Sequence, residues 1–230
     1  IPRRLENQLS QNPFSLPENI NQMVIKDFDR AFNADSLSAY LYESFKQDFD
    51  KQKADTVLRW TQKDTVQRIL AIEQNFGTLQ GYRKRVIGRY ELEQNPPSET
   101  KKLLIEDLTN AQSAISEAVE QYGVIFRSFL EYVNLISNER NFSDPQIDNF
   151  VDNYKTRVRS DLNERIIEQY LVMYYEVSQP AMEKYVSFYE SDKGQWYQNT
   201  YNQAVLEAYQ KAANRFIALT GDEESNKSDR

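Results

Sequence analysis

Apolar residues recur at helical spacing along nearly the whole chain. Steps of three and four positions place them on one face of a helix in residues 17–32, 37–49, 57–72 and 79–90. The first of these stripes comprises Ile20, Met23, Val24, Phe28 and Phe32. No segment shows the alternation of a half-buried strand, and 6 glycines and 7 prolines are too few turn residues for a β protein. The pattern predicts an all-α fold.

The middle of the chain carries the most regular stripe. Its members are Leu104, Leu108, Ala111, Ile115, Ala118, Tyr122, Ile125, Phe129, Tyr132 and Ile136. They alternate steps of four and three, which is a heptad seam about 48 Å long if one helix carries it. We interpret the seam as the core of an intramolecular bundle. The alternative is a coiled-coil homodimer through residues 104–136.

Prolines, glycines and polar stretches divide the chain into five predicted segments. Residues 1–16 are an extended lead-in, and 17–95 form an N-terminal helical unit that ends at two consecutive prolines. Residues 98–140 are a long middle helix, and 144–221 form a C-terminal helical unit. Gly221 is typical of a helix C-terminus, so the polar residues 222–230 are expected to be a disordered tail.

A weak internal repeat relates the two helical units. Sliding the chain by 128 positions places Trp60 on Phe188 and Asp64 on Asp192, with the apolar register kept without a gap. The shift predicts a multi-helix bundle built from two degenerate helical-hairpin repeats joined by the long middle helix. A chance alignment of two amphipathic hairpins is the alternative.

Composition excludes several classes of function. The chain has neither His nor Cys, which excludes Ser-His-Asp triads, cysteine nucleophiles, zinc fingers and His-containing di-iron centres. Its 28 basic and 35 acidic residues give a net charge of −7, which argues against nucleic acid as a partner. No apolar run is long enough for a transmembrane segment. Carboxylates are the remaining strong acid–base groups, so a carboxylate-based hydrolase is a less favoured alternative.

Two charged clusters are candidates for chemistry. Asp144, Asp148 and Asp152 share a helix face, but acidic residues are favoured near a helix N-terminus, so we predict a solvated stripe and no metal site or cofactor. The basic cluster comprises Arg83, Lys84, Arg85 and Arg89, with Tyr82 and Tyr90 directly before and after it. It is interpreted as a solvated helix face, with contact to anionic lipid or an acidic partner as the alternative. Gly81 and Gly88 lie seven apart and favour close helix packing.

Aromatic residues are dense between positions 170 and 201. Most are expected in the core, because rings supply apolar area that the chain otherwise lacks. Consecutive pairs such as Tyr174-Tyr175 cannot both face one core, so some tyrosines must lie at a rim suited to ligand or partner contact.

Residues 188–195, Phe-Tyr-Glu-Ser-Asp-Lys-Gly-Gln, carry a family resemblance. The stretch resembles the aromatic-Tyr-x-Ser-x-x-Gly-Gln motif of the bacterial domain-of-unknown-function 2059 family, with Asp192 in place of the usual proline. The resemblance covers 50–60 residues, roughly a quarter of the chain. It implies a helical protein exported to the bacterial envelope, periplasmic or secreted, with no established activity. The chain begins with Ile1, so we expect a processed or trimmed product.

These observations predict a non-enzymatic binding or scaffold module. Its partner would be an unknown protein, and the alternative is a carrier that holds a small apolar or aromatic ligand between helices. The predicted binding residues are Tyr185, Phe188, Tyr189, Ser191, Gly194, Gln195 and Trp196. We also expect Ser191 or Asp192 to cap the last helix, and Gly194→Ala to be nearly neutral.

Overall fold

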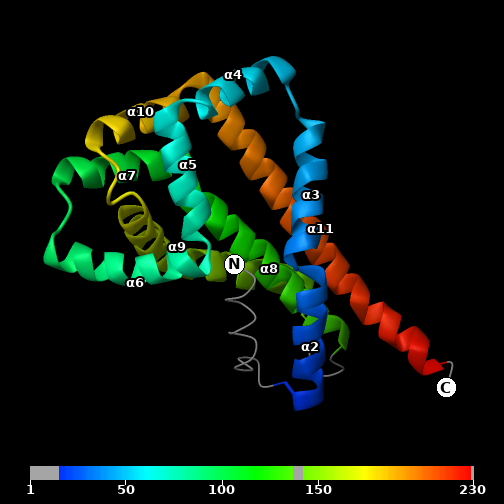
Figure 1. Ribbon diagram of the computed structural model, residues 1–230. Helices are drawn as coiled ribbons and strands as arrows, with labels where there is room; N and C mark the ends of the chain where they lie inside the picture. The colour runs from blue at the N-terminus through cyan, green and yellow to red at the C-terminus, as the bar shows by residue number, and fades with distance from the viewer. Residues whose placement is uncertain (1–15, 137–141, 229–230) are drawn as a thin grey trace. The chain divides into compact units, whose positions relative to one another are not determined.

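The computed structural model describes residues 16–136 and 142–228, the last eight of these as backbone only. Helices dominate this part of the chain and no strand occurs in it, which confirms the all-α prediction (Figure 1). Apart from Leu16, the predicted lead-in lies outside the described residues. In chain order the helices are α2 (Glu18–Ala31), α3 (Ala34–Gln47), α4 (Lys51–Thr61), α5 (Asp64–Phe76), α6 (Leu79–Gln94), α7 (Glu99–Ala111), α8 (Ala114–Ile136), α9 (Asp144–Met173), α10 (Gln179–Glu190) and α11 (Asp192–Ser228).

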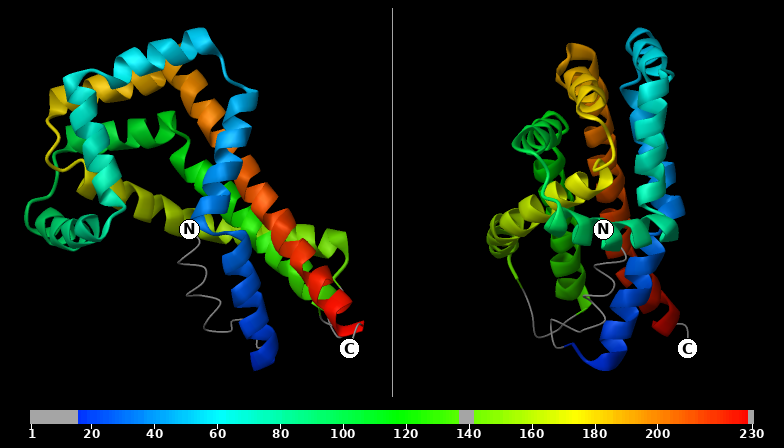
Figure 2. Two further views of the ribbon diagram at one scale, coloured as in Figure 1. Left: turned by 45° about the vertical axis from the view of Figure 1, so that its right-hand side comes forward. Right: turned by 60° about the vertical axis from the view of Figure 1, so that its left-hand side comes forward.

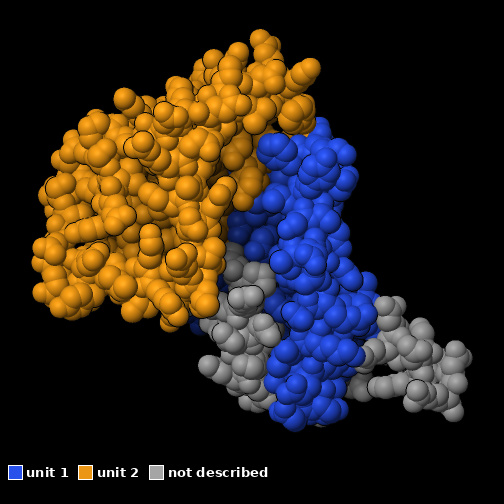
Figure 3. All heavy atoms as spheres, in the orientation of Figure 1, with its two compact units in different colours: residues 1–47, 119–158, 202–230 blue, residues 48–118, 159–201 orange. Residues whose placement is uncertain are grey.

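The chain divides into two compact units that do not follow the predicted segments. Unit 1 comprises residues 1–47, 119–158 and 202–230, and unit 2 comprises 48–118 and 159–201 (Figure 3). Both are discontinuous because α8, α9 and α11 each begin in the core of one unit and continue into the other. The predicted units 17–95 and 144–221 therefore each contribute helices to both cores.

The core of unit 1 combines aromatic stacking with one buried carboxylate. The ring of Tyr132 stacks on that of Phe216, with centroids 4.3 Å apart. Its hydroxyl donates a hydrogen bond to Asp27, at 2.8 Å, and Arg30 lies 3.2 Å from the other oxygen of that carboxylate. Asp27 is 1% exposed, so these contacts satisfy a charge that would otherwise be costly to bury.

The predicted long middle helix is broken. α7 ends at Ala111 and α8 begins at Ala114, with Ser113 at a φ of 53° between them. The Ser113 carbonyl accepts the first hydrogen bond of α8, and the amide of Gln195 donates to the Ala111 carbonyl at 2.9 Å. The seam itself packs within the chain, since Leu108 lies in the core of unit 2 and Phe129 in that of unit 1. This packing agrees with the interpretation of the seam as the core of an intramolecular bundle.

The C-terminal boundary also differs from the prediction. α11 continues through Gly221 to Ser228, with a negative φ at that glycine, so Gly221 does not end the helix. Residues 222–228 are helical rather than a disordered tail, and the last two residues lie outside the described part. Glycine is tolerated inside a helix at a cost of about 1 kcal/mol, which a long helix can absorb.

Helix boundaries agree with the 128-residue shift. α4 and α10 begin at Lys51 and Gln179, and α5 and α11 begin at Asp64 and Asp192. The link before α5 is two residues long, whereas Ser191 alone precedes α11. Superposition of the two hairpins stays a prediction.

Candidate functional site

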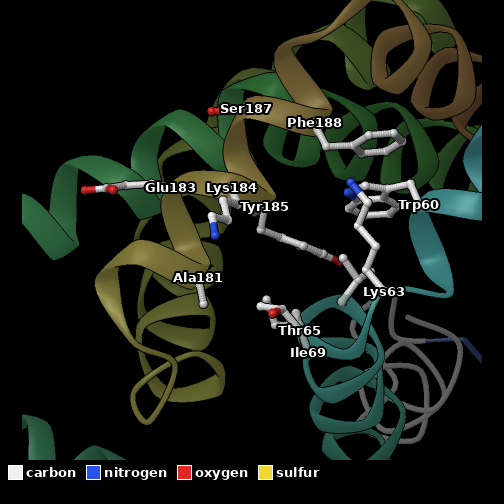
Figure 4. A pocket seen from close by; sticks show the side chains of 11 residues that line it. Trp60, Lys63, Thr65, Ile69, Ala181, Glu183, Lys184, Tyr185, Ser187 and Phe188 are labelled. Carbon is white, nitrogen blue, oxygen red and sulfur yellow. The ribbon is translucent and has the colours of Figure 1, made fainter.

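A groove between α5 and α10 lies in unit 2, with Trp60 of α4 at one end. It encloses about 600 Å³, and a neighbouring hollow of about 300 Å³ continues it along the same two helices (Figure 4). We call the two together the α5–α10 groove. Its apolar lining consists of Trp60, Val66, Ile69, Ala181, Tyr185 and Phe188. The polar residues at its edges are Lys63, Thr65, Arg68, Glu183, Lys184 and Ser187.

Local sequence explains how each helix presents its lining. On α10, Ala181, Lys184, Tyr185 and Phe188 follow one another at steps of three, one and three, which places them on one face. α10 begins at Gln179, directly after Ser178, and has proline in its first turn, where proline is favoured. Its adjacent face, including Met182, is buried in the core, so the orientation of the helix is fixed by packing.

An aromatic stack forms one end of the groove. The indole of Trp60 lies on the ring of Phe188, with centroids 3.6 Å apart and planes at 9°. Tyr185 stacks on the same indole at 5.4 Å, and Tyr189 meets it edge-on at 5.8 Å. Trp60 therefore packs with the lining of the groove as part of the buried core of unit 2.

A half-buried carboxylate is hydrogen-bonded to this aromatic lining. Glu73 of α5 accepts hydrogen bonds from the hydroxyls of Tyr174, at 2.6 Å, and Tyr185, at 2.7 Å. Desolvation raises the pKa of Glu73 above its ordinary value, and the two phenol hydrogen bonds partly oppose that rise. Burial also raises the pKa values of Tyr174, Tyr185 and Tyr189, so their hydroxyls stay protonated and available as donors.

The edges of the groove are mainly basic. Lys63 and Arg68 lie on the α5 side and Lys184 on the α10 side. Figure 4 shows the carboxylate of Glu183 pointing away from the space between the helices. In a chain of net charge −7, this local excess of positive charge favours a ligand with a negative group.

Two of the predicted binding residues, Tyr185 and Phe188, line the groove. Three others have structural roles nearby. The amide of Gln195 donates to the carbonyls of Ala111 and Tyr189, and Tyr189 itself is buried. Trp196 lies below the ammonium of Lys53, 5.6 Å from the ring centroid.

The last two predicted residues build the corner between α10 and α11. The Ser191 hydroxyl accepts from the Gly194 backbone N–H at 3.2 Å, which confirms the predicted cap. The expectation that Gly194→Ala is neutral is wrong. A Cβ at Gly194 would lie 1.9 Å from the Phe188 carbonyl oxygen, so the glycine is required by backbone contact.

Sequence reasoning missed several residues of the site. Val66 and Ile69 belong to α5 and Lys63 immediately precedes it, more than a hundred positions from α10, and nothing local pairs the two helices. For Glu73, the sequence did contain a signal of its role. It continues the apolar stripe of Val66 and Ile69 at the next four-residue step, where a carboxylate on a buried face indicates a polar network.

Within the described residues, no group of three acidic side chains is placed to hold a metal ion. Asp148, from the acidic stripe of α9, is hydrogen-bonded to Arg127. None of the described helices has the length and apolarity needed to cross a bilayer.

Comparison of the chain with protein-family models, with curated proteins and with solved structures finds no match.

Proposed function

We propose that this chain is a non-enzymatic binding protein whose α5–α10 groove holds a small aromatic or apolar ligand with a negatively charged group. The observation that carries the proposal is the hollow of about 600 Å³ next to the Trp60–Phe188 stack. That volume and its mostly apolar lining with a few charged groups are typical of small-molecule sites.

The chemistry of the groove supports binding rather than hydrolysis. A hydrolase built on carboxylates needs an acid and a base that both reach the substrate. Glu73 lies behind Tyr185 and is already hydrogen-bonded to two phenols, and Glu183 points away from the space. Lys184 and Lys63 remain as groups that attract an anion.

The place of action is a further part of the proposal. Export to the bacterial envelope rests on the resemblance of residues 188–195 to the domain-of-unknown-function 2059 family, and the ligand would then be met outside the cytoplasm. A scaffold that binds a protein partner is the second candidate, favoured by exposed apolar side chains outside the groove and outside α6, such as Tyr42 and Leu58.

Trp60 provides a direct test. The chain has two tryptophans, so Trp196→Phe leaves Trp60 as the single indole, inside the groove. Two related probes share an anilinonaphthalene ring system. One, 8-anilinonaphthalene-1-sulfonate, carries a negative charge, and the other, N-phenyl-1-naphthylamine, carries none. We expect both to quench Trp60 saturably and the sulfonate to bind more tightly.

Two variants locate the binding. Lys184→Gln should weaken binding of the sulfonate about 2- to 5-fold, with little effect on the neutral probe, while Lys193→Gln on α11 should change neither. Ala181→Leu fills the groove and should weaken both probes. If the two probes bind Ala181→Leu as tightly as they bind the parent protein, and both proteins unfold at the same temperature, the groove is not the binding site.

A further inference from the structure

The outer face of α6 is apolar although solvent surrounds it. Its large apolar residues, Leu79, Tyr82, Val86, Ile87 and Tyr90, have exposed fractions between 55% and 77%. α6 lies at the periphery of unit 2 in Figures 1 and 2. A contiguous exposed apolar stripe of this kind is typical of an interaction surface.

Two glycines explain why the apolar side faces outward. Gly81 and Gly88 are buried, and a Cβ at Gly88 would lie 2.6 Å from a methyl group of Val172 on α9. At 100° per residue, Leu79 and Val86 lie roughly opposite these glycines. The helix therefore packs through its glycine side, which leaves its larger apolar side chains without a partner in unit 2.

Basic residues lie within and beside this apolar face. α6 carries four cationic residues and two acidic ones, Glu91 and Glu93 near its end, so the helix has a net positive charge within a protein of net charge −7. Two of the cations are used within unit 2, since Arg85 donates to the Phe76 carbonyl and Arg89 pairs with Glu168 at 2.7 Å. The other two, Arg83 and Lys84, are exposed.

We propose that α6 docks on a membrane surface that contains anionic lipids. Leu79, Val86 and Tyr90 fall within roughly 40° of one another on the helix and span about 16 Å along it. In the interface plane these three side chains enter the boundary between headgroups and acyl chains, where tyrosine rings are favoured. Arg83 and Lys84 then lie at headgroup level and contact lipid phosphates.

Charge and shape favour this occupant over a second copy of the chain. Two copies joined through α6 would bring the same cations face to face, which is unfavourable. The face belongs to a single helix at the edge of unit 2, and a fluid bilayer conforms to such a surface. The proposal does not depend on a ligand in the α5–α10 groove.

Vesicle binding tests the proposal. We expect the chain to sediment with phosphatidylcholine vesicles that contain phosphatidylglycerol, and to dissociate as salt is raised. Removal of both free cations, as Arg83→Gln with Lys84→Gln, should lower the partition coefficient roughly 10- to 30-fold, because each contributes about a factor of five at an anionic surface. The matched control, Arg157→Gln with Arg159→Gln on α9, removes two exposed cations elsewhere and should have little effect.

The lack of native cysteine makes a site-specific readout simple. A nitrobenzoxadiazole label on Val86→Cys should shift to shorter wavelength on vesicle addition, while the same label on Leu103→Cys, an exposed position of α7, should not. Three results would each overturn the proposal. They are equal binding to vesicles without phosphatidylglycerol, no shift at position 86, and a dimer in solution that Val86→Glu dissociates.

Discussion

The indole of Trp60 and the phenyl ring of Phe188 lie face to face, 3.6 Å between centroids, and the two residues are 128 positions apart. Each lies nine positions after the first residue of its helix, Lys51 in α4 and Gln179 in α10. Contact between residues in equivalent positions is what a local two-fold relation between the hairpins would produce. The stack therefore links the sequence repeat to the lining of the groove.

This relationship predicts energetic coupling between the two rings. In a double-mutant cycle of Trp60→Ala and Phe188→Ala, we expect a coupling energy of about 0.5–1.5 kcal/mol, because stacked rings contribute that much beyond the area they bury. The measurement is the free energy of unfolding in urea. Trp60→Ala combined with Leu103→Ala, at an exposed position of α7, should be additive. Additivity in the Trp60–Phe188 pair as well would show that the stack contributes nothing specific.

Helix starts could be predicted because their signals are local. Ser98, Ser178 and Ser191 each precede the first residue of a helix, as the sequence indicates. The break between α7 and α8 has no such signal, since Ser113 adopts a positive φ without glycine or proline nearby. The partner that satisfies the freed Ala111 carbonyl comes from α11, which a local pattern cannot reveal.

The groove was only half predictable for the same reason. Tyr185 and Phe188 belong to a dense aromatic segment, where the crowding of rings leaves Phe188 only partly buried while Tyr185 is buried. Their counterparts Val66 and Ile69 belong to a distant helix whose stripe looks like any other. The division into two units is likewise set by contacts between segments far apart in sequence.

The corner at Gly194 gives a sharp stability prediction. Gly194→Ala should destabilise the chain by about 1–3 kcal/mol or more, because its Cβ would meet the Phe188 carbonyl oxygen, which is backbone and cannot rotate away. Gly81 follows Thr78 in the same arrangement, with the hydroxyl accepting from the glycine N–H at 3.1 Å. A Cβ there would lie 2.2 Å from the Asn75 carbonyl oxygen, so Gly81→Ala should behave alike.

Gly77→Ala is the matched control for both corners. It has ordinary helical dihedrals, with φ −75°, and no atom within 4 Å of the added Cβ, so it should be neutral within about 0.5 kcal/mol. Urea unfolding of the three alanine variants separates the two kinds of glycine. Equal stability of all three would contradict the steric account.

Glu73 should make stability depend on pH in the direction opposite to a salt-bridged carboxylate. Desolvation raises its pKa above 4.5, so the folded chain binds this proton more tightly than the unfolded chain does. In the window from 4.5 up to the raised pKa, the folded state holds more protons, and this group's contribution to stability falls as pH rises. Glu73→Gln removes the titration, so the variant should gain stability relative to the parent as pH rises through that window.

The matched variants are Glu183→Gln and Tyr185→Phe. Glu183→Gln removes an exposed carboxylate that takes no part in the hydrogen bonds of Glu73, and it is the control in the same pH series of urea unfolding curves. Tyr185→Phe removes a hydroxyl that donates to Glu73 at 2.7 Å and lowers its pKa. That variant should lose about 1.5–3 kcal/mol at pH values above the raised pKa of Glu73, where the carboxylate is charged, and less below it, where the carboxyl is protonated. If Tyr185→Phe loses the same free energy of unfolding at both ends of the pH series, Glu73 is already neutral near pH 7. The pH dependence expected for Glu73→Gln would then be absent below that pH.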